Sequence, residues 1–243
     1  MGAYSRSDIL SAVRKEIDEI RLNDASFIAS DIDGSELDTI ILHQFGEAVN
    51  FCYDNADMSL LTPKQVPAVD ISALAIGDGS NQSIRIDGAP STPGVMVERA
   101  LLGTQFARLC YARNTSWNRE VTEPLFWNSD ASAKLHNWYT TGTPERPVVY
   151  INRDANTGGF VAYLYCCKTG SSTQVAIIEK PSYNEASIGD GSTSLFEISD
   201  ERIYRAAITY TAALTLLTLK DEHADDLFNL AYQKMGLKTN NNG

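Results

Sequence analysis

The chain has 243 residues, of which 43% are hydrophobic and 21% are charged, as is ordinary for a globular protein with a substantial core. The net charge of −11 argues against a duplex-binding surface, because gripping DNA phosphates takes an excess of Lys and Arg. No run approaches the roughly eighteen apolar residues of a membrane span, and the first twenty residues turn amphipathic and acidic rather than forming a secretory signal. We therefore expect cytoplasmic synthesis without targeting.

Two amphipathic helices are predicted near the N-terminus. The first runs from Ser7 to about Leu22. Apolar residues recur on one of its faces at helical spacing: Ile9, Val13, Ile17 and Ile20. Its other face carries the charged residues Arg14, Lys15, Glu16, Asp18 and Glu19. Ser35 is the expected cap of the second helix, whose apolar face is Leu37, Ile41, Phe45, Ala48 and Cys52.

From Thr62 to about Asn184 the apolar spacing shifts to a period of two, which predicts strands. The candidate strands are 83–87, 94–97, 105–112, 146–151, 160–166 and 174–180. The turns at 156–159 and 168–170 are rich in Gly, and each lies between two candidate strands. We expect both turns to close β-hairpins.

Residues 198–236 predict a helical hairpin around which the chain is organised. Ser199 is the expected N-cap, and Gly236 lies where a C-terminal cap belongs. The first helix of the hairpin has its apolar face at Ile203, Ala207, Tyr210, Leu214 and Leu217. This helix is more apolar than an isolated bundle needs, so we expect part of it to contact another subunit.

These elements predict an α+β fold with a discontinuous organisation. A helical bundle domain is formed from both ends of the chain, 1–61 and 197–243, and a β-rich domain, 62–196, is inserted between them.

One enzymatic alternative deserves comparison. The sequence around Asp31 and Asp33 resembles the Asp-x-Asp-Gly motif of haloacid-dehalogenase-type phosphatases, in which the first Asp attacks phosphorus and the second acts as acid or base. The preceding strand is too short for that family, and alternating strands and helices do not follow. Asp33 and Ser35 also suit a turn that leads into a capped helix, which is the reading we favour. No cofactor or metal site is expected, and the four cysteines have no metal-ligand spacing.

All three tryptophans lie within 106–151, among several tyrosines. Trp and Tyr with Arg are typical anchors of stable interfaces. Our candidate interface residues are Trp117, Arg119, Trp127, Trp138, Tyr204, Tyr210, Leu214 and Leu217. Two alternatives remain: the aromatic residues form the core of a β-domain, or the three tryptophans form the platform of a carbohydrate- or protein-binding module.

The chain resembles the head-to-tail adaptor (ring) proteins of tailed phages, and among them those of podoviruses and crAss-like phages. The residues that carry the resemblance are 117–121 (WNREV), 142–149 (GTPERPVV) and the Ala- and Leu-rich helix that includes Tyr204 and Tyr210 before the acidic break at Asp221. The resemblance covers most of the chain.

This resemblance implies a structural virion protein without catalytic residues or cofactors. Such adaptors form homo-oligomeric rings, commonly twelve-fold, beneath the portal protein and in contact with other tail or ring proteins. They enclose part of the DNA conduit that serves genome ejection, without specific binding of DNA or of membrane. They are found in the virion tail connector, after assembly in the host cytoplasm. An acidic protein suits such a conduit because it repels phosphates.

Overall fold

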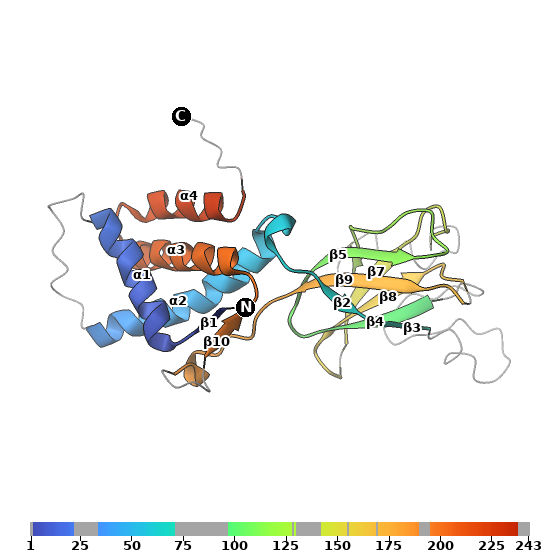
Figure 1. The fold of residues 1–243 in the computed structure, drawn as a ribbon, viewed down its shortest axis with the longest axis horizontal. Coiled ribbons are helices and arrows are strands. Elements are labelled where there is room, and N and C mark those ends of the chain that lie inside the picture. Colours follow the sequence, from blue (N-terminus) through green and yellow to red (C-terminus); the bar gives the residue numbers. More distant parts are fainter. Residues whose placement is uncertain are drawn as a thin grey trace, which may run out of the picture. The chain divides into compact units, whose positions relative to one another are not determined.

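The computed structural model describes residues 2–21, 34–70, 97–127, 129, 142–154, 156–168, 170–189 and 195–237. These residues form a mixed α+β structure that contains four α-helices and three β-sheets (Figure 1). The chain divides into two compact units. The helical unit comprises residues 1–62 and 180–243, and the β unit comprises residues 63–179. Residues 180–196, which the sequence analysis assigns to the insertion, therefore belong to the helical unit.

Helix α1 (Arg6–Arg21) begins at a capping interaction that the sequence analysis did not identify. The Ser5 side chain accepts a hydrogen bond from the backbone N–H of Asp8, and the Asp8 carboxylate accepts one from the backbone N–H of Ser5. The Ser5 hydroxyl also donates to the Asp8 carboxylate, and this bond, together with the one from the Ser5 backbone N–H, lowers the pKa of the Asp8 carboxyl group. Ile9, Val13 and Ile17 are buried as predicted.

Helix α2 (Gly34–Asn55) begins one residue before its expected cap, so Ser35 lies inside the helix. Its predicted apolar face is confirmed for Ile41, Phe45, Ala48 and Cys52, which are all fully buried. A short 3₁₀ turn, η1 (Met58–Leu60), follows and is capped by the Asp57 side chain.

Helix α3 (Glu201–Thr218) is the central helix of its unit and contacts α1, α2 and α4 (Ala224–Lys234). Eleven of its residues are buried, so the chain's own helices cover most of the apolar surface that the sequence analysis assigned in part to another subunit. The residue at its N-cap position is Asp200 rather than Ser199.

Both helices of this hairpin end in a Schellman motif. After α4, the N–H of Gly236 donates to Gln233 O and the N–H of Leu237 donates to Tyr232 O. Gly236 has φ +74°, which confirms the predicted cap. After α3 the same left-handed position is held by Lys220, with φ +58°.

A two-stranded antiparallel sheet joins the N-terminal segment of the helical unit, 1–62, to its C-terminal segment, 180–243. It pairs β1 (Gly2–Tyr4) with β10 (Phe196–Ile198), with Gly2 opposite Ile198. The 3₁₀ turn η3 (Glu185–Ser187) lies before β10 and contacts α2. Nearby, the hydroxyl of Tyr183 donates to the backbone oxygen of Leu42 on α2.

The described strands of the β unit form two sheets. The three-stranded sheet has the order β2 (Lys64–Val66), β9 (Thr173–Glu179), β5 (Phe106–Asn114). The five-stranded sheet has the order β3 (Ala68–Asp70), β4 (Val97–Gly103), β8 (Phe160–Tyr165), β7 (Val149–Arg153), β6 (Leu125–Phe126). All neighbouring strands are antiparallel except β6 and β7.

One hydrophobic core draws side chains from both sheets, among them Leu102, Leu109, Ile151 and Ile177. Among the described strands, the chain passes between the sheets four times: at Pro67, at the turn after Gly103, between β5 and β6, and between β8 and β9. This last passage corrects a prediction. Residues 168–170 do not close a hairpin, because β8 pairs with β4 and β7 whereas β9 pairs with β2 and β5. The hairpin predicted at 156–159 is confirmed as the β7–β8 connection.

Of the other predicted strands, 105–112, 160–166 and 174–180 correspond to β5, β8 and β9. Residues 146–151 overlap β7. Residues 83–87 lie outside the described residues. Of 94–97, only Val97 is described, and β4 begins there and runs beyond the predicted end.

The two units differ in charge. The β unit contains ten Lys or Arg residues and ten Asp or Glu residues, so the whole net charge of −11 belongs to the helical unit.

Candidate functional site

The structure distributes the predicted interface residues over different environments. Trp117 and Tyr204 are buried. Tyr210 and Leu214 are half-buried. Three are exposed: Arg119, Trp127 with 53% of its surface, and Leu217 with 55%. Trp138 lies outside the described residues, as do Asp31 and Asp33 of the phosphatase alternative.

The two tyrosines on α3 serve contacts inside the helical unit. The Tyr204 ring stacks on Tyr4 of β1, with centroids 3.6 Å apart and an interplanar angle of 5°. The Tyr210 ring stacks on Phe51 of α2 at 4.5 Å and meets Phe228 of α4 edge-on at 5.2 Å. Burial raises the pKa of the Tyr204 hydroxyl, and it raises that of Tyr210 to about 12.

Trp117 and Arg119 lie together at a groove of about 580 Å³ on the β unit. Its wall also contains the end of β5, the following turn, Ser172 before β9 and Gln174 of β9. Trp117 itself is 8% exposed, and its indole N–H donates to the backbone oxygen of Cys166 at 3.2 Å. The indole is therefore a buried part of the groove lining, whereas Arg119 is exposed at the surface.

The turn that carries Trp117 is fixed by the buried Asn114, which is 1% exposed. The side-chain oxygen of Asn114 accepts a hydrogen bond from the backbone N–H of Ser116, as in an Asx turn. Its side-chain amide donates to the hydroxyls of Ser171 and Thr173. Arg113 in turn donates to the side-chain oxygen of Gln174 at 2.6 Å.

The structure brings together the two β-unit stretches on which the family resemblance depends. The backbone N–H of Asn118 donates to Pro144 O at 2.8 Å, and the 142–146 turn is closed by paired backbone hydrogen bonds between Thr143 and Arg146. Gly142 is required in this turn, since it has φ +99° and a Cβ there would lie 2.9 Å from Arg146 O.

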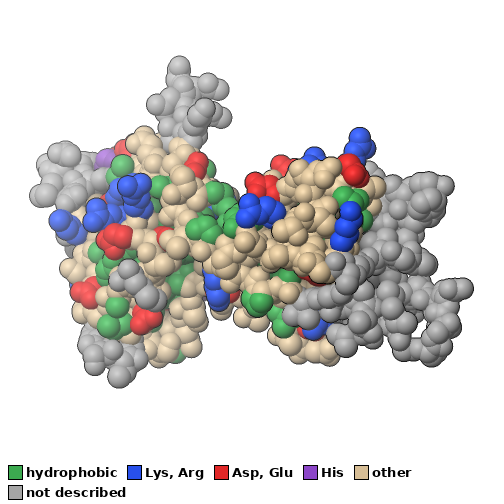
Figure 2. All heavy atoms as spheres, turned by 45° about the vertical axis from the view of Figure 1, so that its right-hand side comes forward, with side chains coloured by type: hydrophobic (Ala, Val, Ile, Leu, Met, Phe, Trp, Pro, Cys, Tyr) green, Lys and Arg blue, Asp and Glu red, His purple; other side chains and the backbone are tan. Residues whose placement is uncertain are grey.

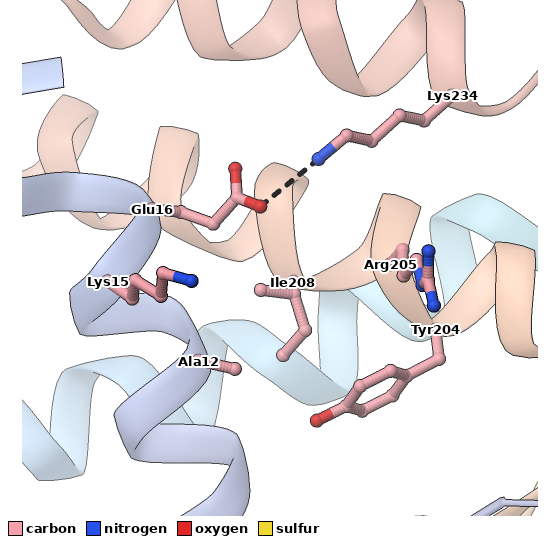
Figure 3. Close-up of a pocket in the computed structure, with 7 residues that line it drawn as sticks. All are labelled: Ala12, Lys15, Glu16, Tyr204, Arg205, Ile208 and Lys234. Carbon is pink, nitrogen blue, oxygen red and sulfur yellow. Dashed lines mark hydrogen bonds and ion pairs between the residues drawn. The ribbon is translucent and has the colours of Figure 1, made fainter. Parts of the chain in front are cut away.

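A second groove, of about 390 Å³, lies on the helical unit between α1, α3 and α4 (Figure 3). Its charged residues are Lys15 and Glu16 of α1, Arg205 of α3 and Lys234 of α4. Its other lining residues are Ala12, Tyr204 and Ile208. Figure 2 shows Lys and Arg side chains gathered on the visible face of this unit, with Asp and Glu side chains around them.

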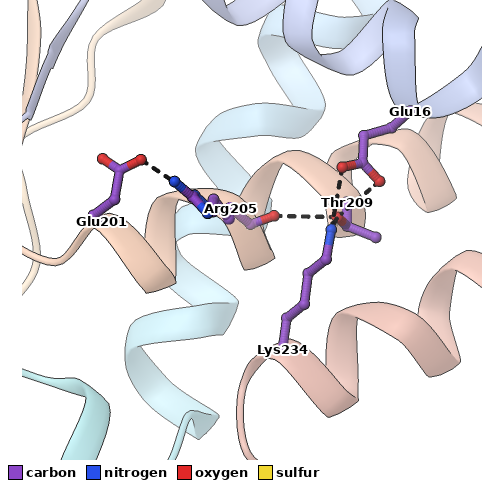
Figure 4. Close-up of polar contacts among 5 residues, drawn as sticks. All are labelled: Glu16, Glu201, Arg205, Thr209 and Lys234. Atoms are coloured by element: carbon purple, nitrogen blue, oxygen red, sulfur yellow. Dashed lines mark hydrogen bonds and ion pairs between the residues drawn. The ribbon is translucent and has the colours of Figure 1, made fainter.

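A hydrogen-bonded network joins the three helices at this groove (Figure 4). The ammonium group of Lys234 lies 3.1 Å from a Glu16 oxygen and donates to the Thr209 hydroxyl at 2.6 Å. The Thr209 hydroxyl lies within hydrogen-bond distance of Glu16 and of the backbone oxygen of Arg205. Because Thr209 is fully buried, no substrate can reach its hydroxyl, and the network serves to hold α1 and α4 against α3.

The sequence analysis missed this groove. It assigned Glu16 to the solvent-facing side of the first helix, whereas the side chain of Glu16 is 25% exposed and pairs with Lys234. These two residues are 218 positions apart, so no local pattern could have indicated the contact.

Among the described residues, no group of three or more His, Cys, Asp or Glu side chains is placed to hold a metal ion. The described helices include none that is long and apolar enough to cross a membrane. No protein-family model matches the sequence, and no curated protein matches it significantly.

Proposed function

We propose that this protein is a ring-forming head-to-tail adaptor of a tailed phage, which docks below the portal and encloses part of the DNA conduit. It works by shape and assembly rather than by catalysis, and it requires no cofactor. Its partners are further copies of itself, the portal protein and adjacent tail or ring proteins, and its place is the tail connector of the virion.

The observation that carries the proposal is the meeting of residues 117–121 and 142–149. Both stretches resemble the adaptor family, and they are separated in sequence by an aromatic-rich segment. The bond from Asn118 to Pro144 makes them one surface, in which Arg119 stands exposed beside the groove. Because both stretches carry the resemblance, we expect this surface to contact a neighbouring subunit of the ring or the portal protein.

The separation of charge supports a conduit role for the helical unit. A wall along which DNA slides must not bind phosphates, and the whole net charge of −11 belongs to this unit. The β unit, with equal numbers of acidic and basic residues, suits contacts with other proteins.

We further propose that the helical unit is a discontinuous bundle into which the β unit is inserted. The contacts of α3 with α1, α2 and α4 support this organisation. Because α3 is largely covered within the monomer, a ring contact of this unit would use its exposed end at Leu217 and the exposed Leu230 of α4.

The test is the mass of the purified full chain by native mass spectrometry, alone and with the portal protein encoded in the same genome. Imaging by cryo-electron microscopy would show whether rings form. Arg119→Glu should weaken assembly or portal binding, whereas the matched reversal Arg99→Glu, at an exposed position of the other sheet of the β unit, should not. A chain that stays monomeric and binds neither a portal nor another ring would refute the proposal.

A further inference from the structure

Two arginine side chains at the groove of the β unit have no carboxylate partner among the described residues. Arg113 lies near the end of β5 and Arg119 in the segment that follows, and both are exposed. Arg113 donates to the neutral side-chain oxygen of Gln174, and in the described part of the chain neither arginine forms an ion pair. Glu120, the one acidic residue in the lining, is exposed and pairs with neither of them. Both guanidinium groups therefore keep N–H donors that are available to an incoming acid.

The surrounding hydrogen bonds hold these arginines in place. Arg113 and Gln174 lie opposite each other in the β5–β9 register, so their 2.6 Å hydrogen bond spans the two strands. Arg119 follows Asn118, whose backbone N–H donates to Pro144 O at 2.8 Å. An arginine pairs best with a carboxylate or a phosphate, to which it can donate two parallel hydrogen bonds. An acid that enters the groove gains such bonds without displacing an ion pair.

The size and charge of the groove indicate acidic side chains of a protein rather than DNA. Its volume of about 580 Å³ lies within the roughly 300–1,000 Å³ that is usual for ligand sites, so it admits a few side chains. Holding a DNA backbone takes an excess of Lys and Arg, whereas the β unit contains ten of these residues against ten Asp or Glu residues. The ligand that fits is therefore a short acidic protein segment.

The helical unit presents such a segment where α3 connects to α4. We call residues 221–226 the acidic corner; its acidic residues are Asp221, Glu222, Asp225 and Asp226. Glu222 and Asp225 are exposed, and neither forms an ion pair within the described part of the chain. The backbone of the corner is fixed, because the Asp221 side chain accepts a hydrogen bond from the backbone N–H of His223 at 3.0 Å. The corner therefore presents two unpaired carboxylates on a defined backbone.

We propose that the groove lined by Arg113 and Arg119 receives the acidic corner of a second copy of this chain. This inference rests on the proposed ring assembly and identifies one of its contacts. The carboxylates of Glu222 and Asp225 pair with the two guanidinium groups. Leu217, which is 55% exposed in the last turn of α3, adds apolar surface to the same contact. Because the contact joins two different patches, it is heterologous, and its repetition produces a ring or a filament.

The test is a charge-reversal series on the full chain, with self-association measured by analytical ultracentrifugation at low and at high salt. Arg113→Glu/Arg119→Glu reverses the groove, and Glu222→Lys/Asp225→Lys reverses the acidic corner. Each double variant should raise the dissociation constant at least about tenfold, because like charges then face each other. An equimolar mixture of the two double variants should regain association, since each groove then meets a complementary corner on the other variant. Association of the unaltered chain should weaken with salt.

Arg99→Glu/Arg153→Glu is the matched control, because it reverses two exposed arginines of the other sheet and changes the net charge of the chain by the same amount as the groove variant. It should leave association unchanged, and circular dichroism of every variant should match that of the unaltered chain.

The outcomes separate this inference from the adaptor proposal. If the unaltered chain assembles and both double variants assemble equally well, the inference is overturned and the adaptor proposal stands. If the unaltered chain is monomeric alone and with the portal, both fail. A fourfold variant that carries both reversals should associate as the mixture does. Recovery by the fourfold variant without recovery by the mixture would place the pairing within one chain and overturn the inference.

Discussion

The carboxylate of Asp200 joins three segments of the helical unit, and its removal should be costly. It is 7% exposed and accepts hydrogen bonds from Tyr53 on α2 at 3.1 Å, from Thr62 after η1 at 2.5 Å and from its neighbour Ser199 at 3.0 Å. Burial, followed by the nearby charge of Asp200, raises the pKa of the Tyr53 hydroxyl, which therefore stays protonated as the donor.

The size of the effect follows from what each variant leaves behind. Asp200→Ala leaves the Tyr53 hydroxyl, on a side chain that is 2% exposed, without its acceptor, at about 1–3 kcal/mol. It also removes a negative charge from the N-terminus of α3, worth about 0.3–1 kcal/mol. We expect a loss of about 2–4 kcal/mol in the free energy of unfolding. Tyr53→Phe should cost about 1–2 kcal/mol, and the double variant roughly 1–2 kcal/mol less than the sum.

Urea unfolding followed by far-ultraviolet circular dichroism is the assay, because all the described α-helices belong to the helical unit. Tyr183→Phe is the matched control. Its hydroxyl donates to Leu42 O rather than to Asp200, so its effect should add to that of Asp200→Ala. The coupling free energy is the difference between the effect of the double variant and the sum of the two single effects. A value below about 0.5 kcal/mol for Asp200 and Tyr53, within the usual error of additivity, would refute the stabilising role that we assign to the Asp200 carboxylate.

Three further predictions concern the same unit. Lys220→Gly should raise the free energy of unfolding by about 0.5–1 kcal/mol in urea titration, because φ +58° strains a residue with a side chain; a loss would contradict the strain. Gly236→Ala should lower it by about 1–2 kcal/mol, because φ is +74° and the new Cβ would lie 3.0 Å from Asp57 Cβ. Burial raises the pKa of Tyr4 and of Tyr210 to about 12, so the stability that they confer is complete below about pH 10. This stability should be lost as the pH rises towards 12. Tyrosinate absorbance should appear at a higher pH in the native protein than in the protein unfolded in urea.

Local pattern was sufficient for most of the long elements, although the predicted strand 94–97 ends where β4 begins. Helical spacing placed α1, α2 and α3 within a few residues of their ends, and alternation placed β5, β8 and β9. It failed for strands of three residues such as β1 and β10. Strands this short have no measurable period, and they pair residues as distant as Gly2 and Ile198.

The false hairpin has a different cause. Consecutive strands usually pair, but Cys166 adopts φ +65° at the end of β8, and the chain then passes to the other sheet. The groove on the helical unit was beyond prediction for a third reason. Its charges come from helices at opposite ends of the chain, and in sequence Lys15 and Lys234 look like ordinary solvated residues.

The insertion of the β unit has a consequence for the order of folding during synthesis. Residues 63–179 leave the ribosome as one continuous stretch and contain all the strands of their two sheets, so this unit can fold first. Helices α1 and α2 are made earlier but must wait for α3, which comes more than a hundred residues later, to cover their apolar faces. During that interval the nascent chain exposes Ile9, Ile41 and Phe45. Aggregation and chaperone binding should therefore concentrate on the segment that is synthesised first.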